Sequence, residues 1–178
     1  MFHLTTAQLS FWLLALSFVA AITDARRGLI PNWLTLPTLL IAPLVQLVGA
    51  GPGASLYALF AATCCALVPL LLFGLGAIGG GDVKLFAAIG AVAGMSVGIE
   101  IQLASYGMAT LYALCVLAHR GHLLATLGRS LALLLAPLTP KAKRAVPPPE
   151  SMMSLRLGPA IFAATLATVL ANLCEVSR

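Results

Sequence analysis

The sequence predicts an all-α protein that crosses a membrane about six times. Of its 178 residues, 61% are hydrophobic and only 8% are charged, and the mean hydropathy is +1.04. A soluble domain is about 25% charged, so this chain has too few charges to cover a water-exposed surface. Its apolar residues also gather into runs of about 20, the length that a helix needs to cross the hydrocarbon core. We expect spanning helices over residues 7–23, 33–49, 54–73, 83–99, 101–118 and 157–173.

The first expected helix is followed by a polar elbow. No Lys or Arg precedes the helix, whereas Asp24, Arg26 and Arg27 follow it. A secretory signal peptide has the opposite order, so we expect a retained helix whose N-terminus lies outside. In the elbow, Pro31 disfavours helical structure at the residue before it, and Asn32 is a candidate cap for the second helix.

Glycine and proline mark the next boundaries. Pro37 and Pro43 predict kinks in the second helix, which membrane helices tolerate. The segment 49–53 is an uncharged turn, and the third helix leads into the glycine-rich segment 74–81.

The fourth and fifth helices are expected to meet at Glu100, which we interpret as a membrane boundary. Gly90, Gly94 and Gly98 are spaced by four in the fourth run. Small residues at this spacing form a ridge that lets another helix approach closely.

Residues 119–156 are predicted to form a cytoplasmic basic segment within a single membrane domain that covers 1–178. The apolar stretch 123–138 is short and has Arg129 at its centre. A central Arg in a lipid-facing helix costs at least about 2.5 kcal/mol, so we expect a helix lying in the interface.

The basic residues are distributed unequally between the two sides that this topology predicts. Only Arg178 of the ten falls outside, in agreement with the positive-inside rule. The net charge of +5 is therefore explained by topology in the inner membrane, and a nucleic-acid partner is not expected. The nine residues on the cytoplasmic side are Arg26, Arg27, Lys84, Arg120, Arg129, Lys141, Lys143, Arg144 and Arg156.

No metal or other cofactor is expected. The four cysteines lie in apolar runs without the paired spacing of a zinc site, so we interpret them as packing residues. His119 and His122 are too few for a metal site, and an interfacial cluster is the favoured interpretation.

Asp24 and Asp82 are the candidate catalytic residues. Asp24 ends the first predicted helix and Asp82 precedes the fourth, so two crossings separate them. An even number of crossings returns the chain to the same side, where the two carboxylates can meet. The alternatives are that Asp82 only caps a helix and that Asp24 only balances the neighbouring arginines.

Two adjacent carboxylates can hydrolyse a peptide bond. They share one proton, so the ionised group takes a proton from water while the protonated group polarises the scissile carbonyl. They titrate as a pair, and neither role is assigned to a named residue. Gly79, Gly80 and Gly81 would let the backbone approach a substrate and adopt unusual torsions, and Lys84 is a candidate to modify the charge at Asp82.

These motifs resemble the type IV prepilin peptidase family. Residues 79–85 match the family's GxGD motif, whose aspartate is catalytic, and Asp24 precedes the sequence Ile30-Pro31-Asn32 as the second family aspartate does. Gly158-Pro159 resembles a Gly-Pro pair that often opens the last helix. The short length is most similar to the single-domain members of tight-adherence (Flp) pilus systems.

The resemblance implies an aspartic endopeptidase that removes the basic leader of prepilins or pseudopilins at the cytoplasmic membrane face during pilus biogenesis, with the pilus assembly machinery as a further partner. The four-cysteine domain of larger members is not present, so methyltransferase activity is not expected. Two other classes stay open. A transporter or proton-relay protein would place acids deep within helices, and a non-catalytic assembly scaffold would not need either aspartate.

Overall fold

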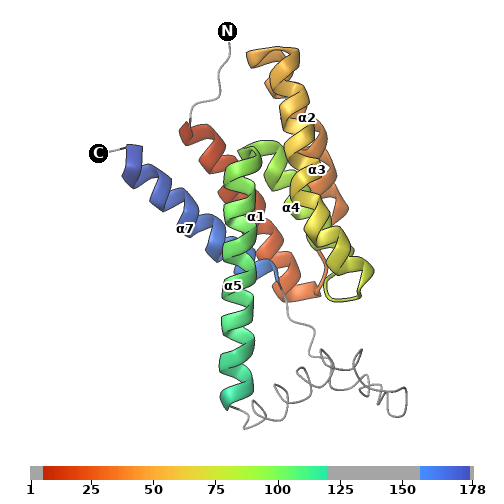
Figure 1. Ribbon diagram of the computed structural model, residues 1–178, viewed down its shortest axis with the longest axis vertical. Coiled ribbons are helices and arrows are strands. Elements are labelled where there is room, and N and C mark those ends of the chain that lie inside the picture. Colours follow the sequence, from red (N-terminus) through yellow and green to blue (C-terminus); the bar gives the residue numbers. More distant parts are fainter. Residues whose placement is uncertain (1–5, 120–156, 177–178) are drawn as a thin grey trace, which may run out of the picture. The chain divides into compact units, whose positions relative to one another are not determined.

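The computed structural model describes residues 6–119 and 157–176, and over these residues the regular structure is entirely helical (Figure 1). Four of the helices in the described part of the chain are long and apolar enough to cross a membrane: α1, α2, α3 and α5. The predicted all-α membrane class is therefore confirmed. The helices are α1 (Thr6–Arg27), α2 (Asn32–Ala50), α3 (Pro52–Gly74), α4 (Gly80–Ala93), α5 (Met95–His119) and α7 (Gly158–Val176).

The contacts between residues divide the chain into two units. The first contains Met1–Met108 and Arg156–Arg178, and the second contains Ala109–Leu155. Of the second unit, the structure describes only the later part of α5. The expected interfacial helix over 123–138, and the basic segment after His119, lie outside the described residues. The prediction of a single domain over the whole chain stays a prediction.

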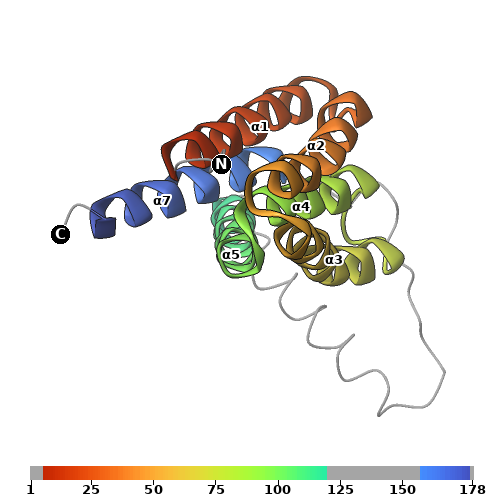
Figure 2. The same ribbon diagram turned by 90° about the horizontal axis from the view of Figure 1, so that it is seen from above.

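Helix α4 lies at the centre of the first unit. All residues from Leu85 to Val92 are buried, and α4 packs against α1, α2 and α3, as Figure 2 shows. A helix that is apolar on every side is stable when other helices surround it. This burial explains why α4 has no polar face.

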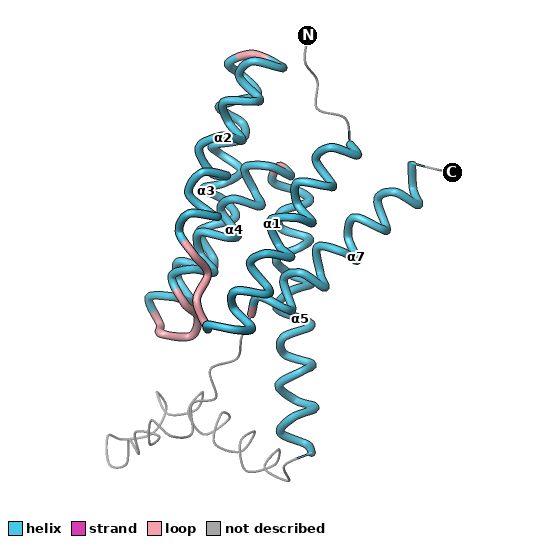
Figure 3. The backbone as a smooth tube through the Cα atoms, turned by 180° about the vertical axis from the view of Figure 1, so that it is seen from behind, coloured by secondary structure: helices cyan, strands magenta, loops and turns pink. Residues whose placement is uncertain are grey.

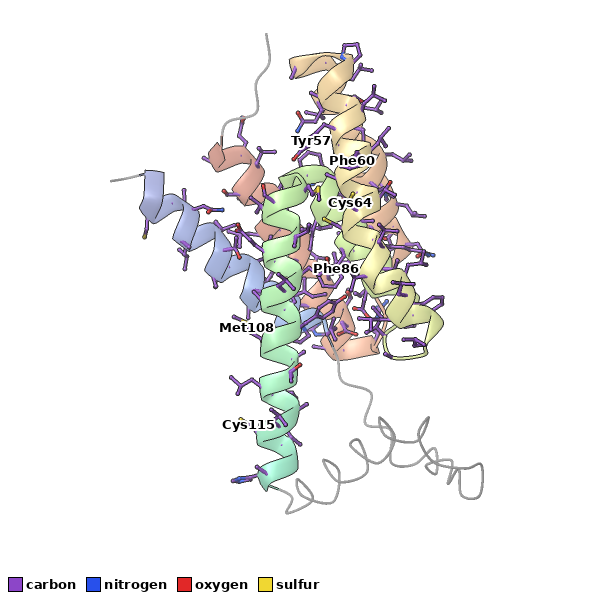
Figure 4. The ribbon with its side chains drawn as sticks, in the orientation of Figure 1. Tyr57, Phe60, Cys64, Phe86, Met108 and Cys115 are labelled. Carbon is purple, nitrogen blue, oxygen red and sulfur yellow. The ribbon has the colours of Figure 1, made fainter. Side chains whose placement is uncertain are left out.

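The expected boundary between the fourth and fifth helices is wrong. Helix α4 ends at Ala93 because Gly94 has a φ of +81°, and α5 begins at Met95, so Glu100 lies inside a helix. The hydroxyl of Tyr57, labelled on α3 in Figure 4, accepts a bond from the Met95 amide at 3.4 Å. With 14 residues, α4 is about 21 Å long, less than the thickness of the hydrocarbon core.

Two of the three spaced glycines serve close packing, as predicted. A Cβ at Gly90 would lie 2.7 Å from the Ala61 carbonyl oxygen, and one at Gly98 would lie 2.7 Å from the Cys65 Sγ. Helices α3, α4 and the first part of α5 therefore approach at the small side chain of Cys65. The third glycine, Gly94, forms the turn instead.

Helices α1 and α7 are far apart in the sequence but lie side by side (Figures 1 and 2). The rings of Phe18 and Phe162 are 5.4 Å apart between their centroids. On α7, the buried residues recur at the helical spacing of three or four: Ile161, Ala164, Thr165 and Val169. This contact brings the start of α7 to the end of α1.

Candidate active site

Both aspartates belong to the same end of the first unit. The α1–α2 and α3–α4 loops lie at this end, and the α2–α3 turn lies at the opposite end (Figure 3). Asp24 is in the last turn of α1 and is 7% exposed, whereas Asp82 is in the first turn of α4 and is half-buried. The arrangement agrees with two helices, α2 and α3, running in opposite directions between them.

The Asp82 carboxylate is held by the backbone at the start of α4. Its Oδ2 accepts a hydrogen bond from the Gly79 amide at 3.2 Å, and its own amide donates to the Gly79 carbonyl oxygen at 3.1 Å. Burial raises the pKa of Asp82 to about 6, against the lowering effect of the Gly79 amide. The charge of Asp24 also raises this pKa.

The Asp24 carboxylate is held by a helix from the other end of the chain. Its Oδ2 accepts a hydrogen bond from the Gly158 amide at 2.8 Å, in the first turn of α7. A Cβ at Gly158 would lie 2.7 Å from the Asp24 Cβ and 2.8 Å from its Oδ2. Only glycine leaves room for the carboxylate in this position.

The structure thus places Asp24 and Asp82 at the same end of the first unit, and the charge of Asp24 is the smallest of the three causes that shift the pKa of Asp82. Each carboxylate also accepts a hydrogen bond from a backbone amide at the beginning of a helix, where the helix dipole favours a negative charge. Such a pair has the chemistry of a shared-proton dyad, in which one group is an acid and the other a base.

The polar elbow after α1 packs against the first turn of α4. A Cβ at Gly81 would lie 3.0 Å from the Ile30 Cβ, so glycine permits this contact. Lys84 donates from its Nζ to the Asn32 Oδ1 at 2.8 Å. Lys84 therefore links α4 to the start of α2.

The sequence predicted that Asn32 caps α2, and this prediction is wrong. The capping position is Pro31, with extended backbone angles, and Asn32 is the first residue of the helix with its side chain turned to Lys84. Proline is compatible with this position because the first amides of a helix lack intrahelical partners.

The three glycines before Asp82 have ordinary backbone torsions, which corrects the expectation of unusual ones. Gly79 has a φ of −81°, and among the described residues positive φ occurs at Gly28, Gly51, Gly76 and Gly94. The turn that needs a left-handed glycine in this loop is therefore at Gly76. A Cβ at Gly79 or Gly80 would lie 3.4 Å from the nearest side-chain atom, a normal contact distance.

Sequence reasoning gave no functional role to two further polar residues in this unit. Tyr106 on α5 lies within electrostatic range of Asp82, accepts a hydrogen bond from Gln102 at 3.2 Å, and packs on Phe86 at 5.6 Å between ring centroids. Thr35 on α2 is 1% exposed, and its hydroxyl has no hydrogen-bond partner among the described residues. The environment of each depends on packing between helices, which the local sequence does not determine.

Comparison with known proteins identifies the family. Searches of the curated proteins and of the solved structures gave no significant match. Residues 11–114 match the type IV leader peptidase family, and this range covers more than half of the chain and both candidate aspartates. The resemblance to tight-adherence members stays a prediction. The chain is a multi-pass membrane protein and belongs to the type IV leader peptidase family.

Proposed function

We propose that this protein is an aspartic endopeptidase of the bacterial inner membrane, which removes the short basic leader from prepilins or pseudopilins at the cytoplasmic membrane face. Asp24 and Asp82 are its catalytic residues in this proposal. The observation that carries it is that two carboxylates, from the end of α1 and the start of α4, lie at the same end of the first unit and each accept a hydrogen bond from a backbone amide. Membership of a peptidase family supports the same reaction class.

The chemistry needs one proton on the pair. The ionised carboxylate takes a proton from water as the water oxygen attacks the scissile carbonyl carbon. The protonated carboxyl group donates a hydrogen bond to the carbonyl oxygen and stabilises the negative charge that develops there. When the C–N bond breaks, the leaving nitrogen takes a proton from the pair. One water molecule is consumed for each peptide bond that is cut, and the pair of carboxyl groups again holds one proton.

The proposed side of the membrane follows from charge and chain direction. Arg26, Arg27 and Lys84 lie in or next to the segments that hold the aspartates. Basic residues concentrate on the cytoplasmic side of inner-membrane proteins. A substrate with an apolar helix and a basic leader would place its cleavage site at this same level, with the apolar helix in the lipid.

The proposal is tested by co-expression with a tight-adherence prepilin, with cleavage read as a gel shift. We expect the wild type to cut, and Asp24→Asn and Asp82→Asn to be inert while present in the membrane at normal levels. Asn keeps the size of Asp and removes the ionisable group. Glu100→Gln, which changes an exposed carboxylate of α5 in the same way, is the matched control and should cut.

Each other result has a defined meaning. Cleavage by both Asn variants would rule out the aspartic mechanism. If the wild type cuts none of several prepilins while the Asn variants still support pilus assembly, a scaffold role replaces the peptidase role. Proton flux in proteoliposomes that both Asn variants abolish, without any cleavage, would favour the proton-relay alternative.

A further inference from the structure

The contact between α7 and Asp24 adds a polar interaction to the packing of α1 against α7. A hydrogen bond from Gly158 to the Asp24 Oδ2 joins residues 134 positions apart, and Gly158 lies outside the residues that match the family. The bond is buried and 2.8 Å long, a distance typical of a charged acceptor.

The space at Gly158 is as specific as its amide. The three atoms nearest to a Cβ at this position would all belong to Asp24. They are its Cβ at 2.7 Å, its Oδ2 at 2.8 Å and its Cγ at 3.2 Å. Gly90 and Gly98 have equally short approaches, but those are to Cys65 and the backbone in the helix core. Among the tightly packed glycines described, Gly158 is thus the one at which an added Cβ would overlap a candidate catalytic side chain.

We propose that Gly158 is a positioning residue, whose amide fixes the Asp24 carboxylate in its reactive orientation and whose missing side chain leaves room for it. This inference rests on the proposed peptidase function. It makes α7 part of the active site, because the first turn of α7 supplies the amide. The hydrogen bond from Gly158 to Asp24 forms only when α7 packs against α1.

The test measures cleavage of a purified tight-adherence prepilin by purified enzyme in detergent, with kcat and KM determined separately. In Gly158→Ala we expect kcat to fall about 10- to 100-fold, because small misplacements of a catalytic group have effects of this size. We expect KM to stay within about twofold of the wild type, because the change acts on Asp24 and leaves substrate contacts intact.

Two alanine variants separate this effect from general damage. Gly107→Ala adds a methyl group where nothing lies within 4 Å, and should behave as wild type. Gly90→Ala creates an equally close contact, but with Ala61 and Cys65 on α3 and not with Asp24. It should lower the melting temperature but leave kcat of the folded enzyme unchanged. An equal loss of kcat in Gly90→Ala would overturn the inference.

An ester substitution separates the donor from the added methyl group, and decides the question if Gly158→Ala does not fold. Glycolic acid at position 158 removes the N–H and adds no atom. Lactic acid at position 160 removes another amide of the same helix end and is the matched control. A loss of kcat at 158 alone supports the inference, whereas equal rates for the two esters overturn it. Asp24→Asn, measured alongside, reports on the proposed function itself: if it cuts, that function fails, and if it is inert while the ester at 158 is fully active, only the inference fails.

Discussion

Asp82→Asn should make the folded protein more stable at neutral pH while it removes peptidase activity. Burial raises the pKa of Asp82 from 3.8 to about 6, so an ionised carboxylate at this position opposes folding. The difference corresponds to an upper value of about 3 kcal/mol, since each tenfold step in acidity is worth about 1.4 kcal/mol. Asn has no charge to bury, and its oxygen can still accept the Gly79 amide that Asp82 binds at 3.2 Å.

The pH dependence gives this prediction its sign. Below about pH 4 the carboxyl group is protonated in both folded and unfolded states, and it does not affect the relative stability of the two proteins. As the pH rises from about 4 to 6, the unfolded chain loses this proton while the folded chain keeps it, so the wild type loses stability. Above about pH 6 the full difference between Asp82→Asn and the wild type is present.

The measurement is unfolding in detergent micelles, followed by tryptophan fluorescence at a series of pH values from 4 to 8. Glu100→Gln is the control, because it changes an exposed carboxylate in the same way. The reasoning is refuted if Asp82→Asn is no more stable than the wild type at pH 7.5, or if its advantage is the same at pH 4 as at pH 7.5.

Three other predictions follow from the same coordinates. The value of kcat/KM should fall as the pH rises through about 6, where burial places the pKa of Asp82 and the pair loses its shared proton; a flat profile between pH 5 and 8 would contradict this. Gly98→Ala should lower the free energy of unfolding by about 1–3 kcal/mol, because the new Cβ would lie 2.7 Å from the Cys65 Sγ. Adding Cys65→Ala should recover part of that loss in a double-mutant cycle of thermal unfolding, and strictly additive losses would show that the two residues do not interact. Thr35→Val should raise the melting temperature, because it removes a buried hydroxyl that has no hydrogen-bond partner among the described residues, a group that costs about 1–3 kcal/mol. A lower melting temperature would show that the hydroxyl is bonded in the membrane.

The sequence was sufficient to predict the helical class, whereas the catalytic pairing of the two aspartates stays a prediction. Both predictions depend on features that are additive along the chain: the length of apolar runs and the number of crossings between Asp24 and Asp82. Helices α1, α2 and α3 begin and end within a few residues of the apolar runs, because glycine, proline and charged residues stand at their ends.

The division between α4 and α5 could not be predicted in the same way. The apolar run continues through Gly94 to Ile99, and hydropathy does not distinguish a glycine that packs from one that turns the chain. Gly90 and Gly98 pack against Cys65, whereas Gly94 has a positive φ. Only the contacts with neighbouring helices determine which glycine takes which conformation.

The two carboxylates are oriented by the same device but at different ranges along the chain. Asp82 binds the amide of Gly79, three residues away, so its orientation is formed with the first turn of α4. Asp24 binds the amide of Gly158, and this bond requires the packing of α1 against α7. Asp82 is in the first turn of α4, whose residues from Leu85 to Val92 are all buried. In the proposed reaction, completion of the dyad therefore depends on the α1–α7 contact, which sets the position of Asp24.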